Sequence, residues 1–144
     1  MKFFIDTANL DQIREANELG VLDGVTTNPS LMAKEGIRGV ENQRKHYLEI
    51  CEIVGGDVSA EVIATDLEGM IKEGEELAAL HPNIVVKVRC IEAGIKAIKY
   101  FTRKGIRRIV RWFSLSVRRY WRLRPGLRMY RPLSGVWMIL PATG

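Results

Sequence analysis

Four short apolar segments, each followed by a stretch with helical spacing of its apolar residues, constrain the fold most. The segments are rich in Phe, Ile and Val and end in polar or turn residues, as buried strands do. They cover residues 2–5, 25–26, 58–63 and 84–88. The helical stretches cover 10–17, a turn starting at Ser30, 40–54, 66–80 and 91–102. Strands that alternate with helices predict an α/β fold with a parallel sheet.

Four βα units within about 105 residues suit two architectures, one half of a (β/α)₈ barrel or a small doubly wound sheet. No GxGxxG follows the first strand, and no GxxxxGK[ST] occurs anywhere in the chain. Nucleotide binding through either phosphate loop is therefore not supported.

The charge of the chain is divided between two unlike parts. Residues 1–104 carry a net charge of −4, whereas residues 105–144 carry nine arginines with no lysine and no acid. The net charge of +5 for the whole chain therefore describes neither part. The basic character of the last 40 residues needs an explanation of its own.

Residues 107–144 contain no Asp, Glu, Lys, Asn, Gln or His. All six have codons with A in the second position, and only Tyr120 and Tyr130 break this rule. Codons can be written for residues 109–114 and 128–139 that, when read in a frame shifted by one base, encode amino-acid sequences resembling strands. We therefore expect 1–106 to form the folded part, and 107–144 to be an aberrant Arg/Trp-rich tail produced by a frameshift.

Two other interpretations of the tail remain open. Arginines interleaved with Trp and Tyr, centred on residues 118–122, are what a nucleic-acid-binding segment uses. A basic amphipathic segment at a membrane surface is the second. Neither predicts the missing codon class, so we do not expect a nucleic-acid or membrane partner.

The remaining global features indicate a cytoplasmic protein. Two cysteines, Cys51 and Cys90, suggest a reducing compartment and buried thiols. No apolar run approaches the ~18–20 residues that span a bilayer, and no signal-peptide pattern opens the chain.

Polar residues stand at or near the carboxyl ends of the four predicted strands: Asp6, Thr27, Asn28, Glu61 and Lys87. In a parallel barrel that end forms the catalytic face. A lysine inside Ile-Val-Val-Lys-Val is desolvated, which favours the neutral amine that attacks a carbonyl to form a Schiff base.

Each of these residues also has a simpler interpretation. Lys87 can reach solvent from a strand end, and Asp6 can simply start a helix. Asn28 can form a turn before Pro29, and Glu61 can occupy a solvated alternate position.

Four motifs in order resemble the small transaldolases, which form one subfamily with fructose-6-phosphate aldolase. They are Phe3-Phe4-Ile5-Asp6-Thr7-Ala8, Gly24-Val25-Thr26-Thr27-Asn28-Pro29-Ser30, Val58-Ser59-Ala60-Glu61-Val62 and Ile84-Val85-Val86-Lys87-Val88. The resemblance spans about residues 1–106. It implies a (β/α)₈ barrel assembled as a homo-oligomer, with no metal or cofactor. The implied reaction moves a dihydroxyacetone unit between sugar phosphates of the pentose phosphate pathway.

The resemblance also implies a role for each residue. Lys87 occupies the Schiff-base position, Asp6 handles protons around C–C cleavage, and Asn28, with Thr27 beside it, binds substrate hydroxyls. Glu61 orients the water of imine formation and hydrolysis. Aldolases of the group tend to have Gln there, so Glu61 favours a transaldolase. The family expects Pro where this chain has Arg89.

Half a barrel has consequences for activity. The phosphate site of such barrels usually comes from the loops after strands seven and eight, and open sheet edges favour aggregation. We therefore expect the chain as written to be inactive or barely soluble. The alternatives are a fructose-6-phosphate aldolase, and a non-catalytic fragment with a nucleic-acid-binding tail.

Overall fold

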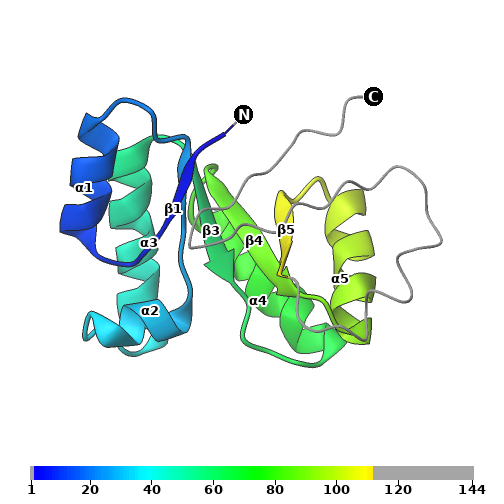
Figure 1. The fold of residues 1–144 in the computed structure, drawn as a ribbon. Coiled ribbons are helices and arrows are strands. Elements are labelled where there is room, and N and C mark those ends of the chain that lie inside the picture. The colour runs from blue at the N-terminus through cyan, green and yellow to red at the C-terminus, as the bar shows by residue number, and fades with distance from the viewer. Residues whose placement is uncertain (1, 112–144) are drawn as a thin grey trace.

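Strands and helices alternate along residues 2–111, which are the residues described by the computed structural model (Figure 1). In chain order the elements are β1 (Phe4–Asp6), α1 (Leu10–Glu18), β2 (Gly24–Thr26), α2 (Pro29–Lys34), α3 (Val40–Val54), β3 (Asp57–Glu61), α4 (Leu67–Leu80), β4 (Ile84–Arg89), α5 (Glu92–Arg103) and β5 (Arg108–Arg111). This alternation confirms the predicted α/β class with a parallel sheet.

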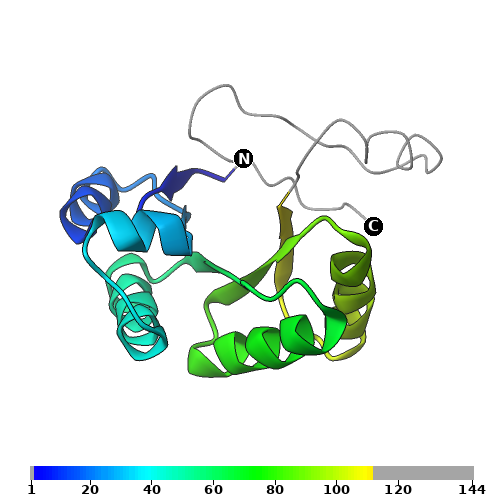
Figure 2. The same cartoon turned by 90° about the horizontal axis from the view of Figure 1, so that it is seen from below.

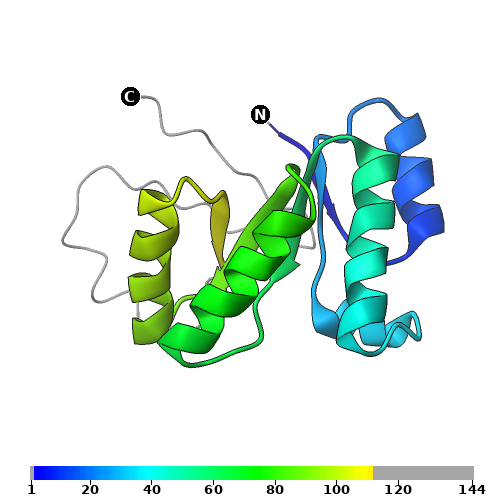
Figure 3. The same cartoon turned by 180° about the vertical axis from the view of Figure 1, so that it is seen from behind.

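The five strands form one sheet in the order β1-β2-β3-β4-β5, and every neighbouring pair is parallel. Seen from below, the strands follow an arc and the helices lie along its outer side (Figure 2). From behind, α3, α4 and α5 cover the convex face of the sheet (Figure 3). A curved parallel sheet with its helices outside is the arrangement of one part of a (β/α)₈ barrel.

Short polar side chains cap α1, α2 and α4, each of which follows a strand. The Asn9 carboxamide oxygen accepts from two backbone N–H groups at the start of α1, and Asp66 caps α4 through Gly69 N–H. These bonds satisfy N–H groups that have no partner within the helix. Gly55 ends α3 with a φ of 61°, in the left-handed region that glycine adopts without strain.

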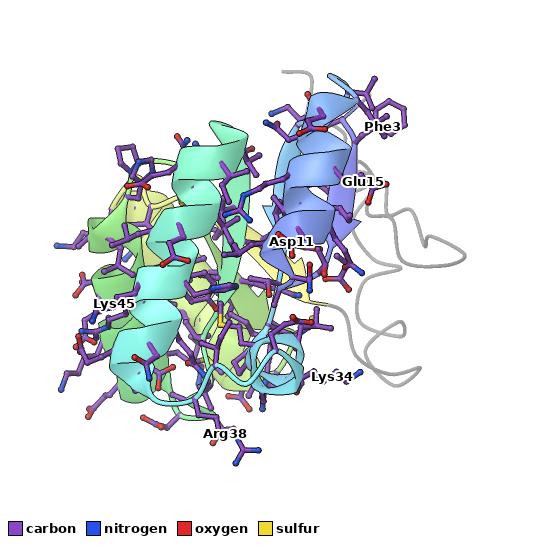
Figure 4. The ribbon with its side chains drawn as sticks, turned by 90° about the vertical axis from the view of Figure 1, so that its left-hand side faces the viewer. Phe3, Asp11, Glu15, Lys34, Arg38 and Lys45 are labelled. Carbon is purple, nitrogen blue, oxygen red and sulfur yellow. The ribbon has the colours of Figure 1, made fainter. Side chains whose placement is uncertain are left out.

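The hydrophobic core lies between the convex face of the sheet and the helices, in two clusters. The first joins the β1–β3 part of the sheet to α1 and α3, and it includes Ile13, Val25, Ile50 and Val58. The second joins β3 and β4 to α4 and α5, and it includes Val62, Met70, Val86, Val88 and Phe101. The outer helix surfaces carry charged side chains such as Asp11, Glu15 and Lys45 (Figure 4).

One glycine allows close packing of two helices. A Cβ placed on Gly74 of α4 would lie 2.3 Å from Cζ of Phe101, a ring of α5 that is fully buried. The ring therefore occupies the space that a side chain at position 74 would take. The missing side chain therefore lets α4 and α5 pack closely against each other.

The structure differs from the sequence prediction at the end of the folded part. Arg108–Arg111 forms β5 and pairs with β4, although the predicted boundary at residue 106 excluded it. The β-branched pair Ile109-Val110 favours a strand despite the flanking arginines. The prediction of an aberrant tail otherwise falls on residues 112–144, which lie outside the described residues.

Candidate active site

The alternation of side chains along parallel strands sets the site residues on the concave face of the sheet. Val58 and Ala60 of β3 belong to the core on the helix side, so Ser59 and Glu61 point to the other face. The same rule places Lys87 there, between the core residues Val86 and Val88. Backbone pairing sets Glu61 directly beside Lys87.

Lys87 and Glu61 form a buried ion pair. The Lys87 Nζ lies 3.6 Å from Oε2 of Glu61, and the two side chains are only 6% and 2% exposed. This burial answers the simpler interpretations, because Lys87 does not reach solvent and Glu61 is not a solvated residue. An amine and a carboxylate held together away from water can exchange a proton while the amine reacts.

Arg89 places a second cation on the same carboxylate. Its Nε lies 3.7 Å from Oε1 of Glu61, and its side chain is 39% exposed. Glu61 therefore contacts the amine of Lys87 through one oxygen and a guanidinium through the other.

Asp6 lies at the end of β1 and is held by the neighbouring strand. The Thr26 hydroxyl donates to Oδ1 of Asp6 over 2.8 Å, and the two residues are direct partners in the β1–β2 register. Ser59 is the next residue in that register, on β3. Its hydroxyl is buried and has no hydrogen-bond partner within residues 2–111. Asp6 is thus oriented by Thr26, a side chain that is not among the predicted site residues.

Asn28 and Thr27 are placed differently from each other. Oδ1 of Asn28 accepts from the backbone N–H groups of Ser30 and Leu31, both at 3.0 Å, and so caps α2. This fixes the orientation of the carboxamide and leaves its NH₂ group for a ligand. Thr27 is fully buried, with no hydrogen-bond partner for its hydroxyl among the described residues. The structure therefore brings Thr26, not Thr27, to Asp6.

Tyr47 of α3 is buried close to Glu61. It is 3% exposed, and burial raises the pKa of its phenol above the ordinary value. A backbone hydrogen bond with Glu61 lowers this pKa, and the Glu61 carboxylate raises it further. Tyr47 thus stays protonated near neutral pH, adjacent to the end of β3.

Cys51 and Cys90 are both buried, as the sequence predicts. Burial, with a smaller contribution from the Glu52 carboxylate, raises the pKa of Cys51 to about 11. Cys51 therefore lacks the lowered pKa that is typical of a nucleophilic cysteine. We therefore assign no catalytic role to Cys51.

The described residues contain neither a cluster of metal ligands nor a membrane-spanning helix. Within residues 2–111, no three His, Cys, Asp or Glu side chains gather as metal ligands. No helix in that part of the chain is long and apolar enough to cross a membrane.

A depression on the concave face lies towards the amino-terminal ends of the strands. Its lining includes Phe4, Thr26 and Ser59, together with Asp57 and Arg107. Arg107 and Asp57 form an ion pair that links β3 to the start of β5.

Comparison with known proteins agrees with this geometry. Residues 3–110 match the model of the Transaldolase/Fructose-6-phosphate aldolase family. Over 107 residues the chain is 99% identical to a probable transaldolase of Parabacteroides distasonis, and 86% identical to one of Phocaeicola vulgatus. A probable transaldolase of Cytophaga hutchinsonii is 74% identical over the same length.

Each of these matches covers 74% of this chain and 49% of the relative. The chain thus spans about half the length of the curated relatives that it matches. The motifs at the strand ends, the parallel half-barrel sheet and these matches lead to one conclusion. The chain belongs to the transaldolase/fructose-6-phosphate aldolase family.

Proposed function

We propose that the site is the amine-bearing half of a Schiff-base transaldolase site, with Lys87 as the nucleophile. The observation that carries this proposal is the buried Lys87–Glu61 pair on the concave face of the sheet. A buried lysine is a suitable nucleophile for a ketone once it loses its proton, and the carboxylate beside it is a suitable acceptor.

The proposed reaction divides the work among three side chains. The neutral Lys87 amine adds to the ketone carbon of the donor sugar, and loss of water gives an imine. Glu61 orients and activates the water that leaves on imine formation and returns on hydrolysis. Asp6 accepts the proton of the substrate hydroxyl as the C–C bond breaks, which leaves a dihydroxyacetone unit on Lys87.

Asn28 binds the substrate in this scheme. Since its carbonyl oxygen is engaged in the cap of α2, its NH₂ group is the part that donates to a substrate hydroxyl. The transferred unit then adds to an aldehyde acceptor. The second candidate, a fructose-6-phosphate aldolase, releases the unit to water; Glu61 favours transfer because aldolases of the group tend to have Gln there.

We further propose that the 144-residue chain does not carry out this transfer between sugar phosphates. The relatives named above are about twice as long as the matched segment. In barrels of this kind, the phosphate group is usually bound by loops after strands seven and eight. The described sheet reaches only its fifth strand.

Fructose 6-phosphate distinguishes these proposals. The chain is incubated with it in the presence and absence of an aldose-phosphate acceptor, and borohydride is then added to reduce any imine. We expect no transferred product, no released triose phosphate and no adduct on Lys87. A fructose 6-phosphate adduct on Lys87 contradicts the proposed inactivity. Release of triose phosphate without acceptor favours the aldolase.

A further inference from the structure

Arg89 is the charged residue nearest the ion pair that the proposed reaction leaves without a role. It lies two residues after Lys87 on β4, so both side chains point to the concave face. Its Nε is 3.7 Å from Oε1 of Glu61, while Lys87 Nζ is 3.6 Å from Oε2. One buried carboxylate is therefore shared between two cations.

Sharing the carboxylate changes the charge balance at the amine. A carboxylate beside a lysine stabilises its ammonium form, and a second cation near the same carboxylate opposes this stabilisation. The guanidinium keeps its charge throughout the working pH range, so its effect does not vary with pH. Lys87, in contrast, has to release its proton before it attacks a carbonyl.

We propose that Arg89 is a positioning residue that holds Glu61 away from full pairing with Lys87 and so favours the neutral, nucleophilic amine. This inference depends on the proposed function in one respect, which is that Lys87 attacks the carbonyl group of a substrate. Arg89 touches neither the substrate nor the reacting atoms in this scheme. It acts through the Glu61 carboxylate.

The other groups around Lys87 have to be considered for its titration. On the β3 side it meets Glu61, with Tyr47 of α3 adjacent to that strand end. On the β5 side its register partner is the apolar Ile109. Across β2 lies Asp6, engaged by Thr26. Because these groups are the same in an Arg89 variant, the variant isolates the effect of the guanidinium.

The test is the pH dependence of lysine labelling with trace formaldehyde and cyanoborohydride in the full chain. In this reaction the neutral amine adds to formaldehyde, water leaves, and hydride reduces the imine to a methylamine. Peptide mass spectrometry measures the rate at Lys87 and, as an internal reference, at the exposed Lys45 (Figure 4). The probe needs no sugar-binding site.

In Arg89→Met we expect the pH midpoint of Lys87 labelling to rise by about 1 pH unit. The rate of Lys87 labelling near neutral pH should then be roughly tenfold lower than in the wild type. Arg89→Lys should stay close to the wild-type midpoint, because it keeps a cation. Arg89→Gln gives a second uncharged variant if Arg89→Met does not fold. The matched control is Arg38→Met, which removes one exposed positive charge away from the site (Figure 4).

An unchanged or lower midpoint in the uncharged Arg89 variants overturns the proposal. An equal shift in Arg38→Met also overturns it, because the effect would then come from net charge alone. Failure of the proposed function gives a different result, in which Lys87 shows the shifted midpoint but forms no imine with dihydroxyacetone.

Discussion

The buried pair of Lys87 and Glu61 allows a quantitative prediction for the stability of the site. At 3.6 Å, two unit charges attract by about 4–5 kcal/mol with an effective dielectric constant near 20. Removing one partner of a buried pair typically costs about 3–5 kcal/mol, since the other charge loses its compensation. We expect Lys87→Met to cost about 3 kcal/mol, at the low end, because Arg89 still contacts the carboxylate.

Glu61→Gln leaves the buried Lys87 ammonium without its carboxylate, and we expect a cost of about 2–3 kcal/mol because the amine can release its proton. The double variant leaves neither charge uncompensated. Its cost should therefore fall about 2 kcal/mol short of the sum of the two single costs. This coupling energy is the measurable signature of the pair.

Urea unfolding followed by circular dichroism at neutral pH and low salt gives the three free energies of unfolding. The lysine variant at an exposed position, Lys45→Met, controls for the loss of a positive charge and should change stability by less than about 0.5 kcal/mol. Additive single costs, with a coupling energy below about 0.5 kcal/mol, would refute the buried pair as described.

Three further predictions follow from individual side chains. Asn28→Ala should cost about 1 kcal/mol through loss of the α2 cap, whereas Asn28→Asp should unfold near the wild-type urea midpoint because it keeps the acceptor; equal losses contradict the cap. Gly74→Ala should destabilise the chain by about 1–2 kcal/mol in the same assay, and Phe101→Leu should relieve part of that cost; a neutral Gly74→Ala contradicts the close contact. The Cys51 pKa of about 11 predicts slow alkylation by iodoacetamide at pH 8, and rapid alkylation of the native chain there would disprove it.

The raised pKa of Cys51 also fixes the sign of a pH effect. The thiol is protonated in both states below its ordinary pKa of 9.0, so its contribution to folding is fully present there. Above that value the unfolded chain loses the proton first, which favours unfolding up to the folded pKa of about 11. Urea midpoints should therefore fall between pH 9 and pH 11, and Cys51→Ala should show a smaller fall.

The parallel sheet, and the position of its polar residues at the carboxyl ends of the strands, could be predicted because both depend on local patterns. A continuous apolar run around Lys87 indicates a strand buried on both faces, and burial of the lysine is one of the two outcomes that the sequence leaves open. Glu61 was harder to place. Alternation alone does not say whether the second face of a strand meets solvent, and here that face lines the concave side of a curved sheet.

Two features depended on contacts between distant segments. Thr26 and Thr27 are adjacent and chemically alike, and only the β1–β2 register shows which hydroxyl meets Asp6. The fifth strand lies in a segment whose composition differs from the rest of the chain, and its pairing with β4 identifies it as part of the sheet. The bond between Thr26 and Asp6 leaves no signal in the local sequence pattern, and the only local signal for the fifth strand is the β-branched pair Ile109-Val110.

The most direct test of the central claim is to identify the amine that forms an imine with dihydroxyacetone. The full chain is incubated with dihydroxyacetone and borohydride at neutral pH, and the labelled lysine is found by peptide mass spectrometry, with Lys87→Met as control. The account predicts that Lys87 is labelled well ahead of the exposed Lys45, and that Lys87→Met loses this preferred adduct. Labelling spread evenly over the surface lysines, with Lys87 unmodified, would contradict it.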